Sequence, residues 1–81
     1  MRRITLLTKS DCALCDQAKD VLERLGAEVP LSVETISLES EEGRRLAEWY
    51  KLLFPPGVLI DGEPFSWGRL SERKLRRALG C

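Results

Sequence analysis

The sequence of 81 residues contains no histidine. Without an imidazole the chain cannot form Cys–His or Ser–His nucleophile pairs, and it cannot build a histidine-ligated metal site. It also lacks a glycine-rich phosphate-binding loop. The formal net charge is zero, which gives no general attraction to nucleic acid or to a membrane surface. These absences argue against several common kinds of active and binding site.

Long hydrophobic runs are missing too. No apolar stretch approaches the roughly 18 residues of a membrane span. The apolar run Ile4–Leu7, which follows the basic start Met1-Arg2-Arg3, is too short for a signal peptide. The chain has three cysteines, and this odd number does not suit a secreted disulfide scaffold. We therefore expect a cytoplasmic protein whose thiols are catalytic or metal-binding.

The composition is that of a small folded domain. Hydrophobic residues make up 43% and charged residues 32% of the chain, which predicts one globular domain over residues 1–81. Charge is uneven: the middle of the chain is acidic, and the last predicted helix is basic, with Arg69, Arg73, Lys74, Arg76 and Arg77. This asymmetry is typical of solvated helix faces, or of a basic edge that attracts an acidic substrate or partner.

Hydrophobic periodicity and turn residues predict seven elements. They are a strand at 4–8, a helix at 12–25 ended by Gly26, a strand at 31–38, a helix at 41–52, strands at 57–60 and 63–67 around the hairpin turn Asp61-Gly62, and a helix beginning after Ser71. The first βαβ unit implies a parallel pair with a right-handed crossover. The sequence therefore predicts an α/β fold of order βαβαββα, with a four-stranded mixed sheet and helices on both faces.

The same patterns predict which side chains are buried. The strand at 31–38 changes phase at Ile36, so it is either covered on both faces or bulged. Pro64 suggests an edge position for the strand at 63–67. In the second helix we expect Leu46, Tyr50 and Leu53 to face inward, and the last helix to bury its apolar residues Leu70, Leu75, Ala78 and Leu79.

The segment Cys12-Ala13-Leu14-Cys15 lies between the first strand and the first helix. At or near the helix N-cap, free N–H groups and the helix dipole stabilise the Cys12 thiolate, and the spacing brings Cys15 within reach to close a disulfide. The same pattern also occurs in metal or cluster sites and as a chance pair of inert thiols. A closed zinc site needs four ligands, and this pair with the distant Cys81 supplies three.

The order of elements and three segments resemble the thioredoxin fold, and in detail a glutaredoxin-like protein. The segment 8–15 is similar to the glutaredoxin active site, where a lysine stands three residues before the first cysteine. The segment 56–62 looks like the cis-proline, strand and turn of that family, and 68–79 looks like its closing loop and helix. The resemblance implies a thiol–disulfide oxidoreductase in which Cys12 attacks, Cys15 resolves and Pro56 shapes the substrate groove.

The sequence departs from the family at three places. Ala13-Leu14 replaces the usual Pro-Tyr between the cysteines, and Pro55, which has no N–H, replaces the valine before the cis-proline. The glycines and acidic residues that meet the amino end of glutathione are replaced around 66–70, where Arg69 is basic. These differences remove contacts that hold glutathione in the family.

Several neighbouring residues have more than one interpretation. Lys9 either stabilises the thiolate or holds a substrate carboxylate, or it is an ordinary loop lysine. Either Pro55 or Pro56 is the cis residue, and Trp67 either packs in the core or flanks the substrate groove. Cys81 is a tail thiol or a third redox cysteine.

We therefore expect an enzyme that reduces protein or small-molecule disulfides through Cys12 and Cys15, with Lys9, Pro55, Pro56, Trp67 and Arg69 contacting the substrate. We expect no tightly bound cofactor, no metal, no nucleic acid and no membrane. Electrons would come from glutathione or a thioredoxin-reductase-type donor, and the chain would act as a monomer. Two alternatives remain: a dimer that shares a [2Fe–2S] cluster through Cys12 and an external thiol such as glutathione, and a non-catalytic binding module.

Overall fold

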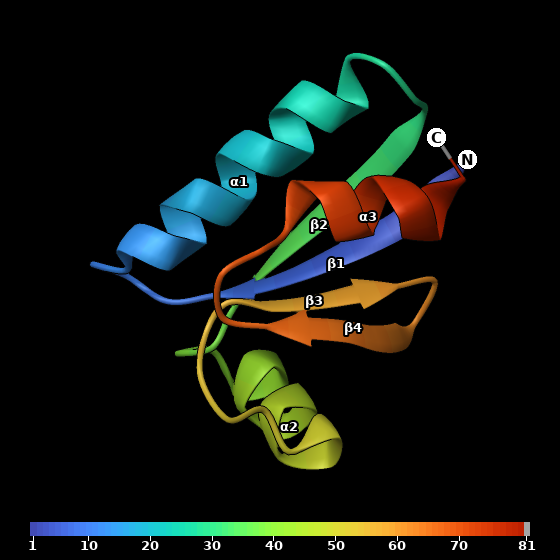
Figure 1. Cartoon of the computed structure of the whole chain (residues 1–81). Coiled ribbons are helices and arrows are strands. Elements are labelled where there is room, and N and C mark those ends of the chain that lie inside the picture. Colours follow the sequence, from blue (N-terminus) through green and yellow to red (C-terminus); the bar gives the residue numbers. More distant parts are fainter. Residues whose placement is uncertain (81) are drawn as a thin grey trace.

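A computed structural model describes residues 1–80. Its elements are β1 (Arg2–Thr8), α1 (Ala13–Gly26), β2 (Leu31–Ser37), α2 (Glu41–Tyr50), β3 (Gly57–Ile60), β4 (Glu63–Trp67) and α3 (Glu72–Leu79). The strands form one sheet in the order β2-β1-β3-β4, in which β1 runs parallel to β2 and antiparallel to β3. Helices α1 and α3 cover one face of the sheet and α2 the other (Figure 1). The predicted element order and mixed sheet are confirmed.

The main core lies between the sheet and the helices α1 and α3. Apolar residues of α1 recur at steps of three and four, so they form a single stripe along the helix. This stripe packs against alternate residues of β1 and β3 and against the start of α3; the cluster comprises Ala18, Val21, Leu22, Leu25, Ile4, Leu6, Val58, Ile60, Leu70 and Leu75. Each fully buried leucine or isoleucine contributes about 1.5–3 kcal/mol. This core fixes the position of the α1 N-terminus relative to the sheet.

Helix α2 packs closely against the end of β2. Its N-cap, Ser40, accepts a hydrogen bond from the Gly43 N–H at 3.0 Å and donates one to the Ser37 carbonyl at 2.6 Å. Gly43 is buried, and a Cβ at this position would overlap the Ser37 carbonyl. The absence of a side chain at Gly43 therefore sets how near α2 approaches the sheet.

The predicted end of the second helix was wrong. Helix α2 ends at Tyr50 because Lys51 adopts a left-handed backbone, with φ 56°, and its N–H bonds back to the carbonyls of Ala47 and Glu48. The following residues leave the helix, and Leu53 is 78% exposed instead of facing inward.

Three other expectations from the sequence need correction. The first helix includes Gly26 and is capped by Ala27, whose φ of −75° requires no glycine. The second strand is neither covered on both faces nor bulged: β2 is a sheet edge with Ser32–Thr35 exposed. Ala78 is exposed, whereas Leu70 and Leu75 are buried as expected.

The hairpin between β3 and β4 forms at the predicted turn. Asp61 and Gly62 both have positive φ, 50° and 85°, as a two-residue hairpin turn requires. The Asp61 carboxylate accepts the Arg3 N–H at 2.9 Å and the Arg2 Nε–H at 2.8 Å, and these contacts lower the pKa of Asp61 below its ordinary value. Pro64 lies in the edge strand β4, as predicted, where the register with β3 shifts between Val58 and Leu59.

Across residues 1–80, every helix is too short or too polar to cross a membrane.

Candidate active site

Four connecting loops lie at one end of the sheet. The strand β1 ends there at Thr8, and β2, which runs parallel to it, ends there too. Because β3 runs antiparallel to β1 and Leu7 pairs with Gly57, β3 begins at the same end. The strand β4 ends there as well, because Trp67 pairs with Gly57. The connections 9–12, 38–40, 52–56 and 68–71 therefore lie at this end, at the left of Figure 1.

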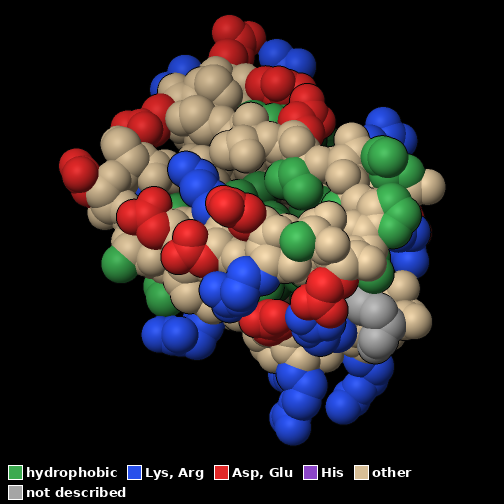
Figure 2. Space-filling view, turned by 90° about the horizontal axis from the view of Figure 1, so that it is seen from above, with side chains coloured by type: hydrophobic (Ala, Val, Ile, Leu, Met, Phe, Trp, Pro, Cys, Tyr) green, Lys and Arg blue, Asp and Glu red, His purple; other side chains and the backbone are tan. Residues whose placement is uncertain are grey.

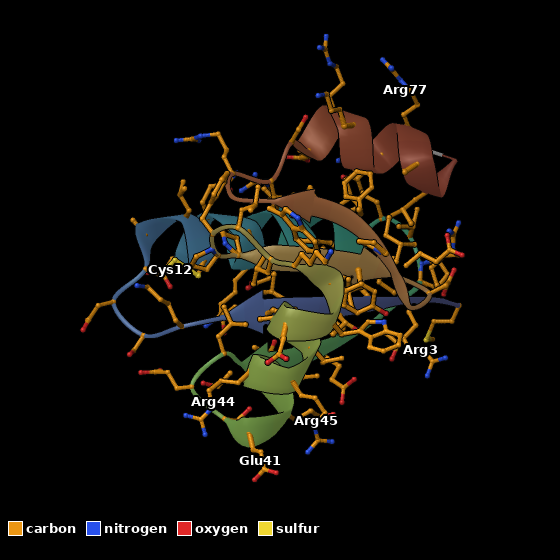
Figure 3. The ribbon with its side chains drawn as sticks, turned by 90° about the horizontal axis from the view of Figure 1, so that it is seen from below. Arg3, Cys12, Glu41, Arg44, Arg45 and Arg77 are labelled. Atoms are coloured by element: carbon orange, nitrogen blue, oxygen red, sulfur yellow. A yellow bond between two sulfur atoms is a disulfide. The ribbon has the colours of Figure 1, made fainter. Side chains whose placement is uncertain are left out.

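Cys12 caps the N-terminus of α1. Its backbone is extended, with φ −127° and ψ 104°, and its Sγ accepts a hydrogen bond from the Cys15 N–H at 3.1 Å. The two cysteines form a disulfide with their Cα atoms 5.2 Å apart. Figure 3 shows Cys12 at the end of the molecule opposite Arg3. The Cys15 N–H and the positive end of the α1 dipole are placed to stabilise a thiolate on the Cys12 sulfur.

The two sulfurs differ in exposure. Cys12 is partly exposed, whereas Cys15 is buried at 1% exposure, one turn deeper in α1. A disulfide substrate in solution can therefore approach Cys12 more easily than Cys15. This asymmetry suits a pair in which one thiol meets the substrate and the other acts only within the protein.

The peptide bond between Pro55 and Pro56 is cis, so Pro56 is the cis residue. Pro56 is buried, directly before Gly57 and therefore beside the end of β1, and Pro55 is half-buried. The carbonyl of Pro56 accepts the Gly68 N–H at 2.8 Å. The backbone of the 55–56 segment is thus tied to the loop that follows β4.

Gln17, which the sequence analysis did not select, ties the same loop to α1. Its side-chain amide donates to the Leu70 carbonyl at 3.0 Å and accepts the Leu70 N–H at 3.2 Å. A paired amide of this kind fixes the position of Leu70 and of its neighbour Arg69. The only signal in the sequence was a polar residue on the partly buried side of the first helix.

Aromatic rings pack on two glycines beside the site. A Cβ on Gly57 would lie 3.1 Å from the Trp67 ring, and a Cβ on Gly68, where φ is 77°, would overlap the Phe54 ring. Trp67 is half-buried and packs on Gly57, and its contact with substrate stays a prediction. Phe54 remains 54% exposed, and together with Leu53 it gives the 52–56 loop an apolar surface that sequence reasoning missed.

The charged residues near the site are exposed. Lys9 and Arg69 are both exposed, and neither forms a salt bridge within residues 1–80. The loop carrying Lys9 is tied to the loop after β2, because the Ser10 hydroxyl donates to the Glu39 carboxylate at 3.1 Å. In the described part of the chain no three Asp, Glu or Cys side chains gather in a way that could hold a metal ion.

Comparisons with known proteins agree with this geometry. The structure is similar to the crystal structure of a mutant of the thioredoxin-like protein BC3987, with a TM-score of 0.77, 27% identity, and coverage of 99% of this chain and 97% of that chain. It is also similar to a mutant thioredoxin from Halobacterium salinarum NRC-1, with a TM-score of 0.72 and 22% identity over 95% of this chain and 70% of that one. The second likeness shows the fold alone.

No curated protein matches the sequence. A family model for the Glutaredoxin-like domain (DUF836) matches residues 3–80, which is nearly the whole chain. The fold, the Cys12–Cys15 pair and this match together show that the chain belongs to the glutaredoxin-like family of thioredoxin-fold proteins.

Proposed function

We propose that this protein is a thiol–disulfide oxidoreductase that reduces protein or small-molecule disulfides. The observation that carries the proposal is the setting of Cys12, whose sulfur caps α1, accepts the Cys15 N–H and is partly exposed. The family membership and the disulfide to the buried Cys15 support it.

The reaction follows from the difference in exposure. In the reduced protein the Cys12 thiolate attacks one sulfur of the substrate disulfide, which forms a mixed disulfide and releases the first substrate thiol. Cys15 then loses its proton and attacks the Cys12 sulfur, which releases the second thiol and leaves the Cys12–Cys15 disulfide. Two electrons and two protons pass from the dithiol to the substrate.

The surrounding residues suit the binding of a disulfide. Lys9 and Arg69 supply positive charge that stabilises the thiolate or holds substrate carboxylates. Pro55, Pro56 and Trp67 form the wall at the start of β3, where an extended substrate segment would lie. The reaction needs no bound cofactor, because the two thiols carry the electrons. Glutathione or a thioredoxin-reductase-type enzyme would return the dithiol to its reduced form in the cytoplasm.

A disulfide-reduction assay with single cysteine variants tests the proposal. We expect Cys12→Ser to abolish the reduction of a model protein disulfide, since no thiolate remains at the α1 N-cap. Cys15→Ser should instead trap the substrate as a mixed disulfide with Cys12, visible by mass spectrometry. Cys81→Ser is the matched control and should keep its activity. An unchanged rate in Cys12→Ser, or a mixed disulfide that forms on Cys81, would exclude the proposed roles.

A further inference from the structure

The two edges of the sheet differ. The edge strand β4 contains Pro64 and an irregular register with β3, two features that discourage pairing with another chain. The opposite edge strand, β2, has seven residues in regular register with β1, and it contains neither proline nor lysine. The β2 edge thus lacks the devices that protect the β4 edge, and Ser32–Thr35 are exposed along it.

The unpaired backbone groups of β2 can be assigned. The Leu38 N–H donates to the Thr8 carbonyl at 2.6 Å, so it points toward β1. Because the direction of the backbone N–H and C=O alternates along a strand, those of Ser32, Glu34 and Ile36 also point toward β1. The backbone N–H and C=O of Val33 and Thr35 therefore point away from the sheet, and they can pair with an added strand.

A hollow above β2 gives this edge an apolar side. It has a volume of about 200 Å³ and lies between α1 and β2, where it is lined by Leu6, Leu22, Val33, Thr35, Lys19 and Glu23. Val33 is 44% exposed there. An added strand would bring further side chains over this hollow and remove its apolar lining from water.

The charges at the rim of the hollow are self-complementary. Lys19 and Glu23 are exposed and lie one turn apart on α1, on the side of the helix that faces β2. A twofold axis perpendicular to the sheet sets two copies of α1 antiparallel, so Lys19 meets the partner's Glu23 and Glu23 meets the partner's Lys19. We propose that β2 pairs antiparallel with β2 of a second copy, which forms a homodimer with one continuous eight-stranded sheet.

Charge and burial together set the register of this pair. An axis through Glu34 would set it directly against the partner's Glu34, and such like-charge pairs are unfavourable. An axis through Val33 or Thr35, whose backbone N–H and C=O point outward, avoids this contact, and we choose Val33 because its apolar side chain gains more from burial. It places Val33 beside the partner's Val33 over the merged hollows, and Ser32 beside the partner's Glu34 on the other face, where a hydroxyl can donate to a carboxylate.

The dimer does not depend on the proposed redox function. Antiparallel pairing sets the two Cys12 residues at opposite ends of the joined sheet, so both stay accessible. The dimer differs from the monomer expected from the sequence alone, where the exposure of this edge was not visible.

Charge reversal on α1 tests the dimer. Self-association would be measured by sedimentation equilibrium at protein concentrations up to about 1 mM. All variants would carry Cys81→Ser, which excludes disulfide-linked pairs. The parent protein should dimerise. Lys19→Glu and Glu23→Lys should each raise the dimer dissociation constant about tenfold. In each variant two surface ion pairs change from attraction to repulsion, and each pair changes the constant a few-fold. The double variant should regain the parent affinity, and a mixture of the two single variants should form the heterodimer. Lys74→Glu and Glu48→Lys, which change net charge equally on other helices, are the controls.

Val33→Pro is an independent variant. It removes an N–H that points away from the sheet, so it should abolish the dimer while the monomer keeps its circular dichroism spectrum. A parent protein that stays monomeric at 1 mM would overturn the proposal. A dimer whose affinity is unchanged in Lys19→Glu and Glu23→Lys would also overturn it. So would a double variant that does not regain the parent affinity.

Discussion

Gln17 has no redox chemistry, yet it connects α1, which is capped by Cys12 and contains Cys15, to the loop that carries Arg69. Its amide makes two hydrogen bonds to the backbone of Leu70, which in turn lies two residues after the Gly68 N–H bound to Pro56. One side chain thus links Cys12, on α1, to the cis-proline segment through a short series of contacts. Gln17 therefore holds the loop 68–71 in a fixed position relative to the N-terminal end of α1.

Replacing Gln17 tests this connection. Gln17→Ala leaves the Leu70 N–H and C=O without their partner, and we expect a loss of about 2 kcal/mol in the free energy of unfolding. Gln17→Glu keeps one acceptor but sets a carboxylate against the Leu70 carbonyl at pH 7. When this carboxylate is protonated near pH 4, its hydroxyl can donate to the Leu70 carbonyl again. The loss in the free energy of unfolding of Gln17→Glu relative to the wild type should therefore be smaller at pH 4 than at pH 7. Urea unfolding at both pH values measures this, and a Gln17→Ala change below about 0.5 kcal/mol would contradict it.

The residues found by sequence reasoning share a local signal. Cys12, Cys15 and Pro56 lie in short segments whose spacing or neighbours indicate the chemistry, and the structure places all three at one end of the sheet. Gln17 was missed because its partner, Leu70, is 53 residues away in the chain. Phe54 was missed because its packing on Gly68 depends on how two distant loops meet.

At the scale of elements, the strands and helices were predicted better than their ends and their exposure. The end of α2 depends on the left-handed backbone of Lys51, a residue type that gives no cap signal. The edge position of β2 depends on which strands pair, and the sequence fixes that order only through the whole topology. The periodicity therefore identified the elements but not the open edge of β2.

The contact between α2 and β2 leads to a prediction about Gly43. In a helix interior alanine is normally favoured over glycine by about 1 kcal/mol. At Gly43 the new Cβ would overlap the Ser37 carbonyl, which belongs to the sheet backbone and cannot rotate away. Because overpacking costs about 1–3 kcal/mol, we expect Gly43→Ala to destabilise the protein by up to about 2 kcal/mol in net terms.

Gly26→Ala is the matched control for this prediction. Gly26 is also helical, but a Cβ there meets nothing within 4 Å, so alanine should stabilise the protein by up to about 1 kcal/mol. Thermal or urea unfolding of both variants decides the matter. Equal, stabilising effects at the two glycines would show that α2 is free to move from the end of β2.

At the scale of the whole molecule, ion pairs join the C-terminal end of α1, and Glu28 just after it, to the first half of α3. Arg76 donates to Glu28 at 2.6 Å and to Glu72 at 3.0 Å, and Arg24 contacts Glu72 at 2.9 Å. The hydrogen bond from Arg76 lowers the pKa of Glu28, and those from Arg24 and Arg76 lower the pKa of Glu72. Other basic side chains of α3 project outward, as Arg77 does in Figure 3, and blue side chains project beyond the lower edge of the molecule in Figure 2.

These shifts set the direction of the pH dependence. A carboxyl whose pKa is lower in the folded than in the unfolded protein stabilises the fold above the unfolded value, here 4.5 for Glu28 and Glu72 and 3.8 for Asp61. This stability is lost as the pH falls through the folded pKa values. We expect the melting temperature to stay level between about pH 7 and 5 and to fall below about pH 4.5.

Arg76→Gln should lower the melting temperature at pH 7 and reduce its fall in acid, because Glu28 then loses the partner that lowers its pKa. Arg77→Gln, on the exposed side of the same helix, should leave both unchanged. Thermal unfolding followed by circular dichroism from pH 7 to 3 measures the two effects. An acid dependence that is identical in Arg76→Gln and the wild type would contradict the role given to these ion pairs.

An equilibrium redox titration of Cys12 and Cys15 tests the central claim most directly. The Cys81→Ser protein would be equilibrated with reduced and oxidised glutathione or dithiothreitol, quenched with acid, and its thiols counted by alkylation and mass spectrometry. We predict one reversible two-electron transition between about −120 and −270 mV, the range of known dithiol oxidoreductases. A pair that forms no reversible disulfide, or that stays oxidised below about −300 mV as structural disulfides do, would contradict a catalytic role and leave a thioredoxin-fold binding module.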